Sequence, residues 1–259
     1  MARRPRLNVS GIPQHVIQRG NNRQAIFFTD ADYRFYLDCL GDAVRKYGCL
    51  VHAYVLMTNH VHLLATPHSS GALSHVMQHL GRRYVQYINY TYRRSGTLWE
   101  GRFKANLVEA ERYFWTCCRY IELNPVRAQM VIKPEDYLWS SYRHNALGVP
   151  DSLVSAHQQY MALGNTAIER RAAYQALFRS SLDDLDLDRI RRAANKGWPL
   201  GDDRFTNEIE VALGRAAWPP KRGRPPKSRD GAACVVPCDE MSLCPRNSVL
   251  MGDPAWRVF

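Results

Sequence analysis

Two histidines separated by one aliphatic residue, His60-Val61-His62, offer the clearest candidate chemistry in the sequence. They lie in a short apolar run that reads as a β-strand. Successive side chains of a strand point to opposite faces of the sheet, so both imidazoles would share one face while Val61 points into the core. Two imidazoles on one face can bind a single metal ion or a phosphate. The pattern is also compatible with ordinary strand histidines, because a lone His-x-His motif is short.

A second pair of candidate residues, Tyr120 and Asn124, lies four residues apart in a segment with helical periodicity. At this spacing both side chains share one helix face, about one turn apart. Two histidines cannot fill the shell of a metal ion, and the Asn124 amide oxygen could add a ligand while the Tyr120 phenol points at the same centre. Imidazole and oxygen ligands together suit Mg²⁺ or Mn²⁺ when the substrate is a phosphodiester. Taken singly, Tyr120 is also typical of a core-edge tyrosine, and Asn124 of a residue that ends a helix before proline.

The charge of the chain favours a polyanionic partner. The formal net charge is +11 and the pI is near 9.5, which suits nucleic acid, although acidic membrane surfaces attract the same charge. Lys and Arg outnumber Asp and Glu by 19 to 10 in residues 1–148 and by 8 to 4 in residues 215–259, whereas residues 149–214 hold 8 against 10. This distribution predicts two nucleic-acid contacts separated by a packing or spacing segment. The candidate DNA-binding residues are Arg82, Arg83, Arg102, Lys104, Lys221, Arg222, Arg224 and Lys227.

Each group of these cations has an alternative interpretation. A solvated charged helix face is the usual meaning of arginines such as Arg82 and Arg83 in the helix expected at 72–92. The segment Trp99–Lys104 mixes aromatic and basic residues, as nucleic-acid surfaces often do, but could also be a core tryptophan with flanking surface charges. The run Pro219–Lys227 (PPKRGRPPK) resembles the core of an AT-hook, in which arginines enter a narrow minor groove, or it is a basic linker without groove preference.

Hydrophobic periodicity predicts the elements that position these residues. Strands are expected at 14–18, 50–57, 61–66 and 105–108, and helices at 33–47, 72–92 and 109–123. The first helix would be capped at Thr29 and end before Gly48, and Pro125 would end the third after Asn124. The order βαββαβα predicts an α+β, ferredoxin-like sandwich over residues 1–148, with an antiparallel sheet carrying helices on one face.

Beyond residue 148 the sequence changes character. Residues 149–214 predict a small all-helical accessory domain, with helices at 156–163, 167–178, 185–194 and 205–213, and its role stays open. Residues 215–259 predict a basic, disordered tail. No apolar run is long enough to cross a membrane and no secretory signal is recognisable, so we expect a cytoplasmic protein. An odd number of cysteines, seven, fits reduced thiols, with Cys39, Cys49, Cys117 and Cys118 in the core.

The two motifs together resemble a known family. His60-Val61-His62 followed by Tyr120-Ile121-Glu122-Leu123-Asn124-Pro125 is similar to the single-tyrosine HUH transposases, and most closely to their REP-associated tyrosine transposase branch. The segment Trp99–Lys104 also resembles the family's segment before the tyrosine helix. The resemblance covers roughly residues 9–148. Many single-tyrosine relatives carry Gln in place of Asn124, whereas the REP-associated branch is compatible with Asn.

The resemblance implies an enzyme that cuts and rejoins single-stranded DNA at hairpins of palindromic repeats (REP-like elements). Tyr120 would be the nucleophile that forms a 5′-phosphotyrosine intermediate, and His60, His62 and Asn124 would bind one Mg²⁺ or Mn²⁺ ion. A covalent intermediate retains the bond energy, so rejoining needs no nucleotide cofactor. The expected protein is nucleoid-associated, makes no membrane contact, and is a monomer or homodimer.

Two other functions remain open from the sequence. The first is a repeat-DNA-binding protein derived from such a transposase that occupies repeats without cutting them. The second is an RNA-binding domain of the same topology, which would want exposed aromatic residues on its central strands. The candidate site offers histidines there instead.

Overall fold

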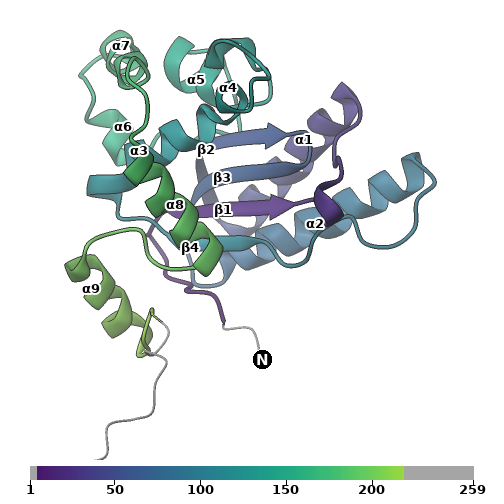
Figure 1. Cartoon of the computed structure of the whole chain (residues 1–259), viewed down its shortest axis with the longest axis horizontal. Helices are drawn as coiled ribbons and strands as arrows, with labels where there is room; N and C mark the ends of the chain where they lie inside the picture. Colours follow the sequence, from purple (N-terminus) through teal and green to yellow (C-terminus); the bar gives the residue numbers. More distant parts are fainter. Residues whose placement is uncertain (1–4, 219–259) are drawn as a thin grey trace, which may run out of the picture. The chain divides into compact units, whose positions relative to one another are not determined.

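A four-stranded antiparallel sheet forms the centre of the fold (Figure 1). The computed structural model describes residues 5–218. The strands are β1 (Gln14–Arg19), β2 (Cys49–Met57), β3 (His60–Pro67) and β4 (Lys104–Leu107), in the spatial order β2-β3-β1-β4. The helices between and after them are α1 (Asp30–Tyr47), α2 (Ala72–Thr91) and α3 (Ala110–Glu122). This order and sheet topology confirm the predicted α+β, ferredoxin-like fold.

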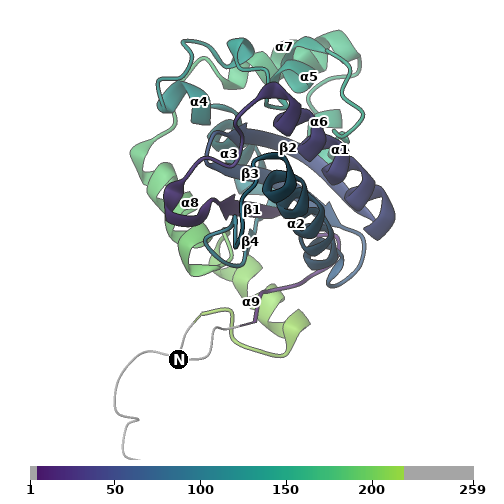
Figure 2. The ribbon, with the colours of Figure 1, turned by 90° about the vertical axis from the view of Figure 1, so that its right-hand side faces the viewer.

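Helices cover both faces of the sheet, which corrects the expectation of helices on one face (Figure 2). Val61 and Leu63 of β3 pack in a core with α1 and α2. Leu64 points the other way and packs in a second core, with Phe114 and Ile121 of α3. Helix α8 (Asp184–Lys196) joins α3 on that second face. Strands buried on both faces explain why β2 and β3 read as nearly continuous apolar runs.

The ends of α1 follow the sequence signals. The buried Asp32 carboxylate accepts hydrogen bonds from the backbone N–H of Phe28 (2.8 Å) and Thr29 (3.0 Å), which satisfies donors ahead of the first turn. Gly48 ends the helix with φ of 69°, in the left-handed region that glycine adopts without strain. Strand β2 follows directly, and a tight turn at Thr58-Asn59 joins it to its antiparallel partner β3.

The third helix predicted over 109–123 is confirmed within one residue at each end, and Pro125 lies in the first turn of a further short helix that was not predicted. Helix α3 ends at Glu122, and after Leu123 a short helix, α4 (Asn124–Arg127), continues with Pro125 in its first turn. Proline is tolerated there because the first-turn N–H groups have no helical partner. The helical path therefore carries Asn124 and Arg127 onward from the end of α3.

The edge of the sheet at β2 is covered by residues 139–141. Ser140 forms an antiparallel bridge with Val55. The N–H of Leu56 donates to the Trp139 carbonyl (2.9 Å), and the N–H of Ser141 donates to the Tyr54 carbonyl (3.0 Å). These bonds occupy part of the backbone groups that a strand edge otherwise offers to other chains.

Further helices follow. They are α5 (Tyr142–Leu147), α6 (Gln158–Met161), α7 (Ala167–Leu177), α8 and α9 (Asp203–Leu213), with 3₁₀ turns at Asn21–Arg23 and Pro134–Asp136. The four helices expected after residue 148 are present within a few residues of their predicted bounds, whereas α5 was not predicted. Within residues 5–218, no helix is long and apolar enough to cross a membrane. The predicted core cysteines, Cys39, Cys49, Cys117 and Cys118, are free and buried.

Buried polar contacts attach the later helices to α3. The Glu122 carboxylate, fully buried, accepts hydrogen bonds from Ser141, Asn145 (3.0 Å) and Tyr174 (2.7 Å), which come from the start of α5, from α5 itself and from α7. The division into domains at residues 148/149 and 214/215 stays a prediction, and residues from 219 onward lie outside the described part.

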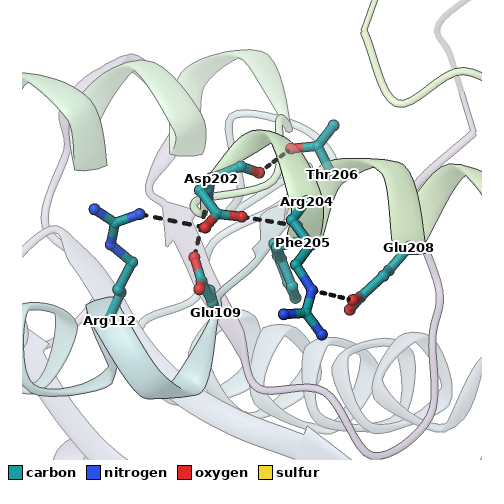
Figure 3. Close-up of polar contacts among 7 residues, drawn as sticks. All are labelled: Glu109, Arg112, Asp202, Arg204, Phe205, Thr206 and Glu208. Atoms are coloured by element: carbon teal, nitrogen blue, oxygen red, sulfur yellow. Dashed lines mark hydrogen bonds and ion pairs between the residues drawn. The ribbon is translucent and has the colours of Figure 1, made fainter.

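Helix α9 attaches at the other end of α3 (Figure 3). Asp202 caps α9 by accepting from the Phe205 N–H (2.8 Å), and its carboxylate also meets the Arg112 guanidinium (3.3 Å). The Asp202 N–H donates to the Glu109 carboxylate (3.0 Å), which lies just before α3. Both ends of the helix that carries Tyr120 are thus held by polar contacts to later helices.

Candidate functional site

Three histidines lie on the sheet face that α3 covers. His60 and His62 share this face of β3, as predicted, with ring centroids 5.0 Å apart. A third, His15 of β1, was not predicted. Its register partner is Leu64, so it lies diagonally next to His62, and its Nε2 is 2.9 Å from the His62 Nδ1. The two rings stack at 5.2 Å. His15 sits in a strand without a motif, and only the pairing of β1 with β3 brings it here.

Tyr120 reaches these histidines from α3. Its ring meets His62 and His15 edge-on, with both centroid distances 5.7 Å. The Tyr120 side chain is mostly buried, at 8% exposure, because α3 lies directly on the sheet. Asn124 follows one turn later, and its Nδ2 donates to the Tyr120 carbonyl (3.3 Å). The structure therefore brings His60, His62 and Tyr120 into one cluster, with Asn124 joined to Tyr120.

Arg127 is a further member of the cluster that the sequence interpretation missed. Its guanidinium carbon lies 4.2 Å from the centre of the Tyr120 ring. Its Nη2 donates to the Asn124 Oδ1 (3.0 Å) and to the Tyr120 carbonyl (3.1 Å). Its Nη1 is buried and has no partner among the described residues. Tyr120, Asn124 and Arg127 are four and three residues apart, a spacing that places side chains on one helical face. The sequence contains this signal, but the expected end of the helix before Pro125 hid it.

Burial keeps the imidazoles neutral. It lowers the pKa of His15 to about 3 and the pKa of His60 to about 4, the latter with help from the Arg19 charge. Burial and then the neighbouring His15, His60, Arg127 and Arg19 hold the pKa of His62 well below its usual range. A neutral imidazole has a nitrogen lone pair to give, which is the form that binds metal ions.

The donor atoms of the cluster fit a divalent ion that is completed by other oxygens. The Asn59 Oδ1, which can only accept, lies 2.6 Å from the His60 Nδ1, so that nitrogen carries the proton and Nε2 keeps its lone pair. Such an outer partner commonly orients a metal-binding histidine. His62 can present Nε2 in the same way when its Nδ1 donates to His15. The Asn124 Oδ1 already accepts one hydrogen bond, from Arg127, and keeps its second lone pair. No group of three or more His, Cys, Asp or Glu side chains suited to a metal ion occurs within residues 5–218.

Within residues 5–218, three of the predicted DNA-binding cations line surface hollows and one is held in an ion pair. Arg82 and Arg102 line a groove between α2 and residues 99–103, and Arg102 and Lys104 line a smaller hollow beside β4. Arg83 is instead paired with Asp42 of α1 (2.8 Å). Lys221, Arg222, Arg224 and Lys227 lie outside the described residues.

Comparisons with known proteins find one family model and two solved structures. A family model described as "Transposase IS200 like" matches residues 8–124. A solved structure of a REP-associated tyrosine transposase bound to a REP hairpin is 16% identical, with a TM-score of 0.50, over 61% of this chain and 93% of that chain. This likeness supports the fold alone. A candidate transposase from Deinococcus radiodurans R1 is 19% identical over 50% of this chain and 92% of that chain, with a TM-score of 0.33. No curated protein matches the sequence.

Proposed function

Because residues 8–124 carry an IS200-like transposase domain, we propose that the protein cuts and rejoins single-stranded DNA with Tyr120 as the nucleophile. The observation that carries this proposal is the cluster of His60, His62 and Tyr120, whose rings meet on one face of the sheet. A phenol beside two neutral imidazoles and a guanidinium is suited to attack a phosphodiester. The substrate we propose is a hairpin of palindromic repeats with single-stranded flanks, as implied by the resemblance to REP-associated transposases.

The proposed step is a transesterification. The Tyr120 oxygen forms a bond to phosphorus, the bond to the 3′ oxygen breaks, and the phenolic proton ends on that 3′ hydroxyl. The DNA is left as a 5′-phosphotyrosine, and attack by another 3′ hydroxyl reverses the step. Edge-on packing against His15 and His62 limits the Tyr120 ring to a narrow range of orientations. A ring held in this way approaches the phosphate from one direction.

Arg127 has two parts in this proposal. Its positive charge lies over the Tyr120 ring and stabilises the negative charge that develops on the phenol oxygen. Its buried, unpartnered Nη1 can also donate to a non-bridging oxygen of the phosphate. One guanidinium would then contact both the nucleophile and the group it attacks.

The residues that would hold Mg²⁺ or Mn²⁺ are His60 and His62 through Nε2 and Asn124 through Oδ1. Such an ion neutralises charge on the phosphate oxygens when bound. Substrate oxygens and water would complete its shell, since both ions prefer oxygen ligands. Arg127 occupies one of the two lone pairs of the Asn124 Oδ1, and the other lone pair is the one that would bind the ion, next to the guanidinium.

The test is a covalent adduct. The protein is incubated with single-stranded repeat hairpins and Mn²⁺, and the products are separated on a denaturing gel. We expect a DNA adduct from the wild type and none from Tyr120→Phe. Tyr113→Phe, on the same helix and outside the cluster, is the matched control and should form the adduct. An adduct that survives Tyr120→Phe refutes the assignment. Tight hairpin binding by a wild type that forms no adduct favours a DNA-binding protein that does not cut.

A further inference from the structure

The hydrogen bonds of His62 continue into the sheet, away from the candidate site. The Nε2 of His15 lies 2.9 Å from the Nδ1 of His62, so one of these nitrogens donates a proton and the other accepts it. The second ring nitrogen of His15, Nδ1, is buried and has no hydrogen-bond partner within residues 5–218. The same is true of the Oδ1 of Asn106 on β4. His15 is 0% exposed and Asn106 is 1% exposed, so neither side chain is open to solvent.

The strand register places these two unpaired atoms on facing residues. His15 of β1 is the register partner of Asn106 of β4. Their neighbours Val16 and Ala105 are also register partners, and they pack in the core with α1 and α2. Because side chains alternate along a strand, His15 and Asn106 both point to the opposite face, which α3 and α8 cover. Residues directly opposite each other in an antiparallel pair have Cβ atoms about 5 Å apart.

Helix α8 closes this part of the sheet. It packs against both β1 and β4 (Figure 1). Its apolar residues Leu187, Ile190 and Ala193 belong to the same buried core as Tyr120. Buried polar atoms in such a core are nearly always paired, because an unpaired one opposes folding. A donor that faces an acceptor across the strand pair would satisfy both.

Two neutral imidazoles that share one hydrogen bond can hold their protons in two ways. In the first arrangement the His62 Nδ1–H donates to His15, which leaves a lone pair on the His62 Nε2 and puts the His15 proton on Nδ1. In the second arrangement the His15 Nε2–H donates to His62, which puts a proton on the His62 Nε2 and leaves a lone pair on the His15 Nδ1. Only the first arrangement gives His62 a nitrogen that can bind a metal ion.

Asn106 favours the first arrangement. Its Nδ2 donates to the Leu107 carbonyl (3.3 Å), so its oxygen is the atom left for another partner. In the first arrangement the His15 Nδ1 carries a proton that this oxygen can accept, and both unpaired atoms are satisfied. In the second arrangement a lone pair faces a lone pair, and both acceptors stay buried without a donor. The first arrangement is therefore the more stable one.

We propose that His15 and Asn106 are positioning residues for His62: the Asn106 oxygen accepts from the His15 Nδ1–H, and His15 accepts from the His62 Nδ1–H, so that the His62 Nε2 keeps its lone pair for a divalent ion. His60 has a comparable partner in Asn59, whose Oδ1 lies 2.6 Å from the His60 Nδ1. The chain of His62 is longer by one ring. The inference rests on the proposed function for the role of His62, but it concerns proton positions in the free protein.

The experiment is nitrogen NMR spectroscopy of the histidine rings in the isotope-labelled, metal-free full chain at neutral pH. A ring nitrogen that carries a proton and one that carries a lone pair differ widely in chemical shift, so the spectrum reports the tautomer of each ring. The signals are assigned by their loss in His62→Gln and His15→Gln. We expect both rings in the Nδ1–H form. An Nε2–H form of His62 in the wild type overturns the inference, and this result needs no variant to fold.

Variants then test the named atoms, with Mn²⁺ as the probe and calorimetry without DNA as the second measurement. Asn106→Leu removes the acceptor. We expect it to give a mixture of the two His62 tautomers and to weaken Mn²⁺ binding about tenfold, the lower end of the loss when an outer partner of a metal ligand is removed. His15→Leu should weaken Mn²⁺ binding at least as much. His15→Gln should retain it within a few-fold, because a side-chain amide can accept from His62 and donate to Asn106.

The matched control is Gln14→Leu. Gln14 is a buried amide of the same strand, 2% exposed, and it points to the other face of the sheet. Its replacement should leave the His62 tautomer and the Mn²⁺ affinity unchanged. A purely structural role predicts that Asn106→Leu lowers stability without changing the tautomer, and that result overturns the inference. Mn²⁺ binding by His15→Gln that is as weak as that by His15→Leu also overturns it.

The outcomes separate this inference from the proposed function. The tautomers and the Mn²⁺ affinity are measured without DNA, and adduct formation is measured separately with Tyr120 intact. A wild type that forms the adduct while His62 has the Nε2–H form refutes only this inference. A protein whose His62 tautomer depends on Asn106 but which forms no adduct refutes only the proposed chemistry.

Discussion

Replacing Arg127 by methionine removes the guanidinium over Tyr120 while keeping an unbranched chain of similar length. The guanidinium carbon lies 4.2 Å from the centre of the Tyr120 ring, into which the charge of a phenolate is partly delocalised. Opposite charges separated by about 4 Å interact with about 4 kcal/mol at an effective dielectric constant of about 20. Water partly screens the half-buried guanidinium, so we take about 2–3 kcal/mol as the free energy by which it stabilises the Tyr120 phenolate. This free energy corresponds to a rate about 100-fold slower, similar to the effect of removing one hydrogen-bond donor from the oxyanion hole of other enzymes.

The assay is single-turnover formation of the covalent DNA adduct at saturating protein. Arg127→Met should be about 100-fold slower, and Arg127→Lys should recover part of the rate because it retains the charge. Mn²⁺ affinity, measured by calorimetry without DNA, should stay the same or rise, since the Asn124 Oδ1 loses its competing donor. A purely structural role for Arg127 would lower both quantities together.

The matched control is Arg119→Met, a change to an arginine of α3, the helix that carries Tyr120; Arg119 donates to the Ser180 carbonyl. It should leave the single-turnover rate within a few-fold of the wild type. An Arg127→Met protein that folds and forms the adduct at the wild-type rate refutes the proposed role of the guanidinium.

Three further predictions concern stability and DNA binding. Burial lowers the pKa of His52 from 6.5 to about 4. The neutral ring therefore stabilises the fold fully above pH 6.5, and this contribution, up to about 3 kcal/mol, is lost as the pH falls toward 4. In urea unfolding, the stability of His52→Gln should depend less steeply on pH than that of the wild type. Glu122→Ala leaves three buried donors without their acceptor and should lower the free energy of unfolding by about 3–5 kcal/mol, whereas Glu122→Gln, which keeps one acceptor oxygen, should lose less in the same urea titration. Deleting residues 219–259 should weaken hairpin binding and flatten its dependence on salt, because the run from Lys221 to Lys227 would no longer neutralise phosphates; unchanged affinity and salt slope in fluorescence anisotropy would make this segment a linker.

The sequence predicts the local features of the fold well. Alternation in the strand places His60 and His62 on one face, and the left-handed glycine at Gly48 ends α1 where periodicity stops. These features depend on neighbours in the chain. The topology followed because the order of strands and helices permits few arrangements.

The missed features depend on pairing between distant segments. His15 joins the cluster only because β1 pairs with β3. In the sequence, Glu122 is typical of an exposed charge on an amphipathic helix. Only the packing of α5 and α7 against α3 shows that its carboxylate is buried and hydrogen-bonded. Helices on both faces of the sheet were missed for the same reason, since the amphipathic pattern of α3 does not say which face it covers.

The segment 139–141 that covers β2 has a consequence for shorter fragments of the protein. The family match ends at residue 124, and a fragment cut there would lose these residues. The apolar strand β2 would then expose its unpaired N–H and C=O groups along Cys49–Met57. Such an open edge is a template for intermolecular β-pairing and amyloid-like aggregation. A fragment that keeps this edge covered therefore needs to extend beyond Ser141, and beyond Ser155 to keep the bridge between Val51 and Val154, although every residue of the proposed chemistry lies before them.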